Sequence, residues 1–187
     1  MTIIQTSRLT LRSVTRDDAP DFARLCNDKT IARHTARIPH PYSLEDAAAF
    51  TKHLEEAALT GTEFAFAICL GEIMIGCCGA DKNAENTAEI GYWVGADHRG
   101  IGVASEAARA ITQFALQRLG VKTVTAGYFI DNPASGRVLE KIGFIKTGET
   151  APLFSLGRGE EAAAVRMVLD QSSFTPGEFS LIDENDS

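Results

Sequence analysis

The feature that most constrains the fold is a strand, a glycine-containing turn and a long helix that follow one another directly. Residues Thr87 to Val94 form a strand-like run, and Arg99–Ala104 (RGIGVA) opens a helical pattern over residues 100–119. Apolar residues recur on one face of this helix, and another strand-like run covers residues 121–128. Strand, helix and strand form a βαβ crossover, so the sequence predicts that the two strands are parallel.

The remaining pattern predicts an α+β fold. Thr15-x-x-Asp18 and Ser43-x-x-Asp46 are helix-start patterns, because a hydroxyl and a carboxylate three residues apart can satisfy free backbone N–H groups. Further strands are expected at residues 8–12, 64–70, 73–79, 144–147 and 162–169, a loop at 33–42, a polar turn at 81–86 and a short helix at 132–142.

Length and charge predict one domain with a tail. A chain of 187 residues fits a single domain of ordinary size, which we place at residues 1–170. Residues 171–187 hold four acidic residues and no basic one, so they carry −4 of the net charge of −7. We expect a solvated, partly flexible tail there, with partner binding as the alternative.

Composition excludes several classes of function. The net charge of −7 argues against a nucleic acid as the main partner, because phosphate binding needs clustered Lys and Arg. No apolar run is long enough for a membrane span, so a cytoplasmic location is expected. The cysteines form no C-x-x-C pair and the histidines lack metal-ligand spacing, so we expect reduced, buried thiols and no metal site. The cysteines are Cys26, Cys69, Cys77 and Cys78.

The glycine turn before the long helix is typical of an anion site. Its two glycines let a ligand approach the backbone, the free N–H groups of the helix start favour a diphosphate, and Arg99 adds a positive charge. A tight turn without a ligand is the alternative. A Walker loop is excluded because Gly102-Val103-Ala104 replaces Gly-Lys-Ser/Thr. A dinucleotide fingerprint fails at Ser105, and residues 121–126 lack the required acid.

The RGIGVA segment resembles the Q/R-x-x-G-x-G/A signature of the GNAT superfamily of N-acetyltransferases. Three further segments resemble its ribosomal-protein-acetylating, RimJ/RimL-like branch, and the resemblance extends over residues 6–170. These segments are Thr6–Arg12 (TSRLTLR), Glu89–Val94 (EIGYWV), and Asn132–Ser135 (NPAS) leading to Glu140–Phe144 (EKIGF). The resemblance implies a mixed, mostly antiparallel sheet with the βαβ unit at its centre, parallel strands that splay apart, and helices on both faces.

The resemblance also implies a site for acetyl-CoA as cosubstrate, with no metal. The pantetheine arm is expected in the gap between the splayed strands, on the backbone of Trp93, Val94 and Gly95. An N–H near Val94 would polarise the acetyl carbonyl. The backbone groups implied to hold the diphosphate are those of Arg99, Gly100, Ile101, Gly102, Val103 and Ala104.

Two residues at the start of the short helix and one strand carboxylate are the candidates for chemistry. By the resemblance, Asn132 binds the pantetheine arm and Ser135 donates a proton to the sulfur as general acid. Asn132 is also a helix cap in the alternative interpretation, with Pro133 at the first helical position, and both roles are compatible. Glu89 is the candidate base, directly or through water; the alternative is an exposed strand carboxylate.

The acceptor is less defined. His34, His40 and Tyr42 are candidate acceptor contacts. In some relatives, a carboxylate that acts as a base follows the Gly-Phe pair. Here the corresponding residues 147–158 contain a single acidic residue, Glu149. This difference weakens the transfer of ribosomal-protein specificity to this chain.

The sequence thus predicts an N-acetyltransferase that acts on a protein N-terminal α-amine or a small-molecule amine by direct attack in a ternary complex, as a monomer or homodimer. The alternatives are a non-catalytic acyl-CoA-binding sensor and an enzyme for antibiotics or polyamines.

Overall fold

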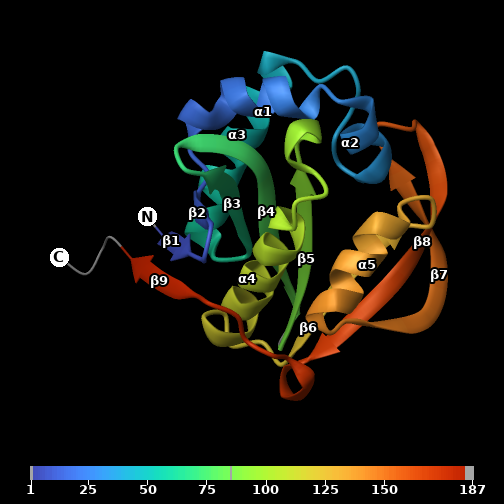
Figure 1. The fold of residues 1–187 in the computed structure, drawn as a ribbon. Coiled ribbons are helices and arrows are strands. Elements are labelled where there is room, and N and C mark those ends of the chain that lie inside the picture. The colour runs from blue at the N-terminus through green and yellow to red at the C-terminus, as the bar shows by residue number, and fades with distance from the viewer. Residues whose placement is uncertain (1, 85, 184–187) are drawn as a thin grey trace.

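The computed structural model describes residues 2–84 and 86–183, and these form one nine-stranded sheet with helices on both faces (Figure 1). The strand order is β7-β8-β6-β5-β4-β3-β2-β1-β9. The strands are β1 (Thr2–Gln5), β2 (Leu9–Ser13), β3 (Glu63–Leu70), β4 (Ile73–Ala84), β5 (Thr87–Val94), β6 (Thr123–Phe129), β7 (Ile145–Ser155), β8 (Glu160–Asp170) and β9 (Ser180–Asp183). The helices are α1 (Ala19–Cys26), α2 (Lys29–His34), α3 (Leu44–Thr60), α4 (Val103–Gln117) and α5 (Pro133–Ile142).

The central pair β5 and β6 is parallel and comes apart part-way along. Pairing joins Thr87 to Thr123, Ala88 to Val124 and Glu89 to Thr125. Both strands then continue, to Val94 and to Phe129, without further pairing between them in the described sheet. The predicted α+β fold with a βαβ unit and splayed parallel strands is therefore confirmed.

Two apolar cores lie on the two faces of the sheet. On one face, α4 and α5 bury Phe114 and Leu139 against the strands, and Phe114 makes an edge contact with Phe66 at 5.1 Å between ring centroids. On the other face, α1 and α3 pack through Phe22 and Phe50, whose ring centroids are 5.5 Å apart. The predicted helices on both faces are confirmed, and the gap between β5 and β6 lies between these two layers.

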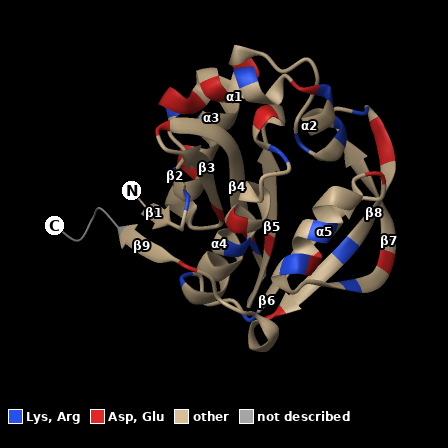
Figure 2. Cartoon of the chain, viewed as in Figure 1, with Lys and Arg blue, Asp and Glu red and all other residues tan. Residues whose placement is uncertain are grey.

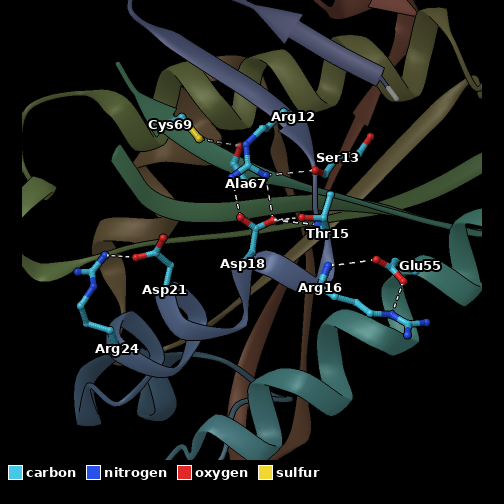
Figure 3. A network of polar contacts seen from close by, with 10 residues as sticks. All are labelled: Arg12, Ser13, Thr15, Arg16, Asp18, Asp21, Arg24, Glu55, Ala67 and Cys69. Atoms are coloured by element: carbon cyan, nitrogen blue, oxygen red, sulfur yellow. Dashed lines mark hydrogen bonds and ion pairs between the residues drawn. The ribbon is translucent and has the colours of Figure 1, made fainter. Parts of the chain in front are cut away.

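The first helical segment begins at a buried ion pair, which Figure 3 shows from close by. Arg12 donates to both carboxylate oxygens of Asp18, at 2.9 and 2.6 Å, and the Thr15 N–H donates to the same carboxylate at 2.8 Å. Burial alone would raise the pKa of Asp18, but the hydrogen bonds from Arg12 and Thr15 outweigh it and leave the pKa below its usual value. The predicted start at Thr15 and Asp18 is confirmed as a capping box.

The second predicted helix start is also confirmed. Ser43 caps α3, and its side chain accepts from the Asp46 N–H at 3.1 Å. The helix ends at Gly61, whose φ of +68° is a left-handed conformation that favours glycine.

Several elements differ from the predictions. Lys29–His34 forms α2, which overlaps the predicted loop, because Asp28 caps it by accepting from the Thr30 N–H at 2.6 Å. The polar turn predicted at 81–86 is wrong for its first part. Strand β4 runs on to Ala84, since Asp81 pairs with Glu63 on one side and Glu89 on the other.

The tail also differs from the expectation over the residues that can be compared. Ser180–Asp183 forms β9, an edge strand antiparallel to β1. The segment before it is attached to α4, where Arg109 donates to the Thr175 carbonyl at 2.7 Å and Gln113 accepts from the Gly177 N–H at 3.1 Å. Residues 184–187 of the predicted tail lie outside the described residues.

No helix within residues 2–84 and 86–183 has the length and apolar character needed to cross a lipid bilayer.

Candidate active site

A cavity of about 960 Å³ occupies the place where β5 and β6 diverge. Its wall includes His34 and Tyr42 from the side of α1 to α3, and Ser105 and Val138 from α4 and α5. The cavity therefore reaches both faces of the sheet through the gap. Of the predicted site residues, those that line it are Glu89, Trp93, Val94, Arg99, Gly100, Gly102, Ala104, Asn132 and Ser135.

The backbone of β5 presents alternate residues to the gap. The Asn86 carbonyl accepts from the Thr123 N–H of β6 at 3.1 Å, and the Gly95 N–H donates to the Ile75 carbonyl of β4 at 2.8 Å. Because N–H and C=O groups alternate between the two edges of a strand, those of Tyr92 and Val94 face the gap.

Two of the predicted backbone contacts are therefore wrong. The amides of Trp93 and Gly95 face β4, and a Cβ at Gly76 of β4 would collide with the Trp93 carbonyl oxygen. Trp93 reaches the cavity through its side chain, which makes an edge contact with Phe22 at 5.7 Å between ring centroids. Val94 keeps the orientation that the predicted role requires.

The glycine turn leaves the start of α4 without a side-chain cap. Gly100 and Gly102 have φ values of +80° and +88°, which favour glycine, and Gly102 occupies the cap position with no side-chain hydrogen bond to the helix. The first N–H groups of α4 therefore have no capping acceptor and fit an anion such as a diphosphate. Ile101 and Val103 do not line the cavity, so only their backbone could contribute.

Arg99 is engaged differently from the prediction of a free charge beside the diphosphate. Its Nη2 lies 2.7 Å from Asp28 Oδ2, and its Nε donates to the Val94 carbonyl at 3.0 Å. Burial would raise the pKa of Asp28, but hydrogen bonds from Thr30 and Arg99 leave it below the usual value. Arg99 is thus neutralised by Asp28 and ties α2 to the end of β5.

The glycine turn is held by residues whose role the sequence did not reveal. Glu106, in the first turns of α4, accepts hydrogen bonds from Thr6, Ser7 and Arg8, the shortest at 2.7 Å. Arg8 Nη1 also donates to the Ile101 carbonyl at 2.9 Å. Burial would raise the pKa of Glu106, but these hydrogen bonds leave it below its usual value. The TSRL segment is one of the segments that carry the family resemblance, and in the structure it fixes the glycine turn to the start of α4 through these hydrogen bonds.

Ser135 lies at the first turn of α5 and contacts β5 across the gap. Its Oγ is 2.9 Å from the hydroxyl oxygen of Tyr92, which also donates to the Ser135 carbonyl at 3.1 Å. Burial raises the pKa of Tyr92 to about 12. Asn132 caps α5 by accepting from the Ser135 N–H at 3.4 Å, so the cap interpretation is confirmed, and the side chain also lines the cavity.

Glu89 belongs to a row of carboxylates on the face opposite α4. Asp81 lies directly across from it in β4, and Glu63 lies across from Asp81 in β3. Arg166 Nη1 is 3.3 Å from Glu89, and Arg37 reaches both Glu63 and Asp81 at 3.1 Å. Burial raises the pKa of Asp81, and Glu63 and Glu89 act in the same direction, against Arg37. The sequence did not identify Asp81 as a residue of this cavity, because it lies in the segment 81–86 that was predicted to be a polar turn.

The predicted acceptor contacts are divided between two places. His34 and Tyr42 line the cavity, whereas His40 lines a separate pocket with Arg33 and Arg158. Burial lowers the pKa of His34, which favours the neutral ring, and raises that of Tyr42. His40 therefore lies apart from the cavity that His34 and Tyr42 line.

The cysteines are free and buried, as predicted. Burial raises the pKa of Cys26 to about 12 and that of Cys77 well above its usual value, so both thiols are protonated at neutral pH. In the part of the chain that the structure describes, no three His, Cys, Asp or Glu side chains are grouped so that they could hold a metal ion.

A family model described as "Acetyltransferase (GNAT) domain" matches residues 8–145. The chain belongs to the GNAT acetyltransferase family. Two curated relatives are the uncharacterized N-acetyltransferases p20 of Bacillus licheniformis, 29% identical over 79% of this chain and 85% of the relative, and YoaA of Bacillus subtilis, 33% identical over 78% and 84%. The GNAT assignment and the predicted acetyl-CoA-dependent acyltransferase are thus confirmed.

Solved structures with this GNAT fold include the type that the sequence resembles. RimL, a ribosomal L7/L12 α-N-protein acetyltransferase in complex with coenzyme A, matches with a TM-score of 0.80 and 18% identity over 90% of this chain and 97% of its own. The spermidine N-acetyltransferase of Vibrio cholerae, in complex with coenzyme A and spermine, matches with a TM-score of 0.75 and 21% identity over 90% and 98%. The predicted GNAT fold is confirmed.

Proposed function

We propose that this GNAT enzyme transfers the acetyl group of acetyl-CoA to a primary amine, either a protein N-terminal α-amine or a small-molecule amine, by direct attack while both substrates are bound. One observation carries the proposal. A single cavity joins the uncapped start of α4 to the Glu89 face of the sheet through the gap between β5 and β6. Donor and acceptor can therefore approach each other from opposite faces.

The donor side is formed by backbone groups. The N–H groups of residues 100–104 would hold the diphosphate, because the helix start carries partial positive charge and no capping side chain, whereas the Arg99 N–H donates to the Ala96 carbonyl. The amides of Tyr92 and Val94 face the gap and would hold the pantetheine arm, with one of them donating to the acetyl carbonyl oxygen. Asn132 would add a side-chain contact at the mouth of the gap.

The chemistry requires one proton to leave the amine and one to reach the sulfur. As the new C–N bond forms and the C–S bond breaks, Glu89 would take the amine proton, directly or through water, and Ser135 would donate to the departing sulfur. Free α-amines titrate at about 7.7–8.0 and lysine at about 10.4, so an α-amine needs less help from a base. Tyr92, hydrogen-bonded to Ser135, would orient that hydroxyl.

A route through an acyl-enzyme has no support from the thiols. All the cysteines are buried, and the raised pKa values of Cys26 and Cys77 oppose formation of a thiolate nucleophile. Direct attack by the acceptor amine is the step that the available side chains favour.

The acceptor wall combines acidic and basic groups. Glu63, Asp81 and Glu89 face the cavity together with Arg37 and Arg166. Two proteins with this fold are named for different acceptors, RimL for a ribosomal protein and the Vibrio cholerae enzyme for spermidine. The fold is therefore compatible with both kinds of amine.

An amine panel tests the proposal. Acetyl-CoA is mixed with the enzyme and with peptides that have a free N-terminus, the same peptides with a blocked N-terminus, polyamines or aminoglycosides, and release of the coenzyme thiol is followed. We expect release that depends on one class of amine and is absent with the blocked peptides. Calorimetric binding of acetyl-CoA without amine-dependent release by any member would instead support the acyl-CoA-binding sensor.

A further inference from the structure

A second, smaller pocket lies against a different face of α2 from the active-site cavity. Its volume is about 440 Å³, and its wall combines three basic residues and a histidine with one acidic residue. The wall residues are Lys29, Arg33, His40, Gly157, Arg158 and Glu160. Figure 2 shows the basic residues that α2 contributes. The acetyl transfer proposed above uses none of these side chains.

Arg158 is a buried cation with a fixed position in this wall. Its side chain is only 6% exposed. Its Nε donates to the Arg33 carbonyl at 2.8 Å, its Nη2 lies 2.7 Å from Asp131 Oδ1, and its guanidinium lies over the Phe129 ring, 4.7 Å from the centroid. Its Nη1 takes part in none of the hydrogen bonds among the described residues. A rigid guanidinium therefore keeps one nitrogen for a ligand.

The carboxylates around the pocket do not cancel its positive charge. Asp131 is shared between Arg158 and Arg33, whose Nη2 lies 2.7 Å from its other oxygen. The hydrogen bond from Arg158, with that from Arg33, lowers the pKa of Asp131 to about 2, so this carboxylate is ionised at neutral pH. Lys29 has no ion-pair partner among the described residues. With Glu160 included, three cations face two carboxylates, which leaves one positive charge, His40 set aside.

His40 shows that the polar groups of this wall are not all satisfied by the protein itself. Its Nδ1 is the one buried side-chain nitrogen or oxygen, within residues 2–84 and 86–183, that has no hydrogen-bond partner. Buried polar atoms without a partner are uncommon in native structures. Excess positive charge, a rigid guanidinium and an unsatisfied ring nitrogen together fit a carboxylate or phosphate group.

Phe129 and α2 lie between this pocket and the active-site cavity. Phe129, whose ring contacts Arg158, lines the cavity at the end of β6. On α2, His34 lines the cavity and the neighbouring Arg33 lines the pocket. A helix with its side chains is about 10 Å across, and an extended peptide covers that distance with about three residues. A ligand whose amine lies in the gap can therefore place a second group in the pocket.

We propose that the acceptor is a primary amine that also carries a carboxylate or phosphate about 10 Å from its nitrogen, and that Arg158, Lys29 and His40 hold this anionic group. The inference rests on the proposed function, because the amine has to reach the acetyl group at the gap. It narrows the acceptors considered above. Peptides with an acidic side chain near the N-terminus, and small amines with an anionic group, are favoured over polyamines.

Matched peptides test the assignment. They consist of alanine with a free N-terminus and an amidated C-terminus, and they carry a single Glu or Gln at one of positions two to five. We expect kcat/KM, followed by release of the coenzyme thiol, to be about five- to tenfold higher for Glu than for Gln at one of these positions. The difference should lie in KM, because the anchoring contact is the same before and during the reaction. It should shrink as salt is added.

Small amines distinguish the two sources of the anionic group. Aminoalkyl phosphates and aminoalkyl carboxylates of graded length are compared with neutral alkylamines of the same length and with spermidine. A higher kcat/KM for an anionic small amine than for any Glu peptide would identify a small molecule as acceptor, and the reverse order a protein N-terminus. Acetylation of spermidine in preference to every anionic amine would overturn the inference.

Variants of the pocket locate the preference. Lys29 is exposed, so Lys29→Gln changes the pocket without disturbing buried contacts, and we expect it to reduce the preference for Glu about threefold. Arg158→Gln should abolish the preference. Lys122→Gln is the matched control, because Lys122 is exposed and lines neither pocket, and the preference should survive in it.

Two results would contradict the assignment while leaving the proposed function intact. One is equal kcat/KM for every anionic amine and its neutral counterpart. The other is a preference for Glu that is undiminished in both Lys29→Gln and Arg158→Gln. Failure of the wild type to acetylate any amine would instead remove the proposed function itself.

Discussion

The hydroxyl oxygen of Tyr92 lies 2.9 Å from Ser135 Oγ, and this contact joins the central strand β5 to the first turn of α5 across the gap. The backbone of Tyr92, like that of Val94, also faces the gap. The contact fixes the serine hydroxyl on the wall of the cavity, at the place where the proposed reaction needs a proton donor.

Replacing Ser135 by Ala should lower kcat by about 100-fold, because a positioned acid contributes on that order. KM for acetyl-CoA should change by less than about twofold, since the Asn132 cap uses the Ser135 backbone N–H, which the variant retains. Steady-state kinetics separate the two constants. An unchanged kcat would show that Ser135 is not the acid.

Replacing Tyr92 by Phe should lower kcat by about tenfold, the equivalent of one hydrogen bond that orients Ser135. The ring stays in place, so the melting temperature should fall little. Combining this change with Ser135→Ala should add nothing further to the loss in kcat, because Tyr92 acts through the serine. Additive losses would contradict that dependence.

Replacing Gly102 by Glu should weaken acetyl-CoA binding by about 100-fold or more, because a like charge beside the diphosphate costs several kcal/mol. Gly102→Ala is the matched control: it imposes the same strain at a φ of +88° without the charge. Calorimetry compares the two. Equal affinities in the two variants would mean that the diphosphate lies elsewhere.

Replacing Glu89 by Gln should reduce turnover more for amines with a high pKa than for α-amines, because only the former depend strongly on a base at neutral pH. Glu63→Gln, which changes a carboxylate on the same face two strands away, is the control. The measurement is kcat/KM for a matched pair of amines against pH. A uniform loss for both amines would argue against the role of base.

Stability towards acid should depend on Asp18. Its pKa is lower in the folded chain than in the unfolded one, so its contribution is present above the unfolded pKa of about 3.9 and is lost as pH falls through the folded value. Asp18→Asn should therefore cost about 2 kcal/mol at neutral pH and less at low pH. Urea unfolding at several pH values measures the difference. A cost that does not change with pH would contradict the linkage.

The elements with strong local signals could be predicted from the sequence. The capping boxes at Thr15 and Ser43, the glycine stop at Gly61 and the βαβ unit each depend on residues close together in the chain. The segment that forms α2 has only six residues and a weak apolar pattern, so the sequence predicts no helix there, and its last two residues fall in the predicted loop at 33–42.

Only the backbone features of the site could be predicted from the sequence. The glycine turn and the gap followed from motifs, but the pairing of side chains did not. Arg99 meets Asp28, 71 residues away, and Glu106 meets Thr6, 100 residues away. Such contacts depend on the assembled sheet, and they changed one expectation, because the pairing with Asp28 neutralises the Arg99 charge that was expected beside the diphosphate.

The divergence of β5 from β6 has a consequence for hydrogen exchange. Two strands in the middle of a sheet would normally protect all their amides, yet the N–H groups of Tyr92 and Val94 face the gap. In the empty enzyme these two amides should exchange with deuterium faster than those of Trp93 and Gly95, which face β4. Filling the gap with coenzyme should slow the exchange at Tyr92 and Val94 and leave their neighbours unchanged.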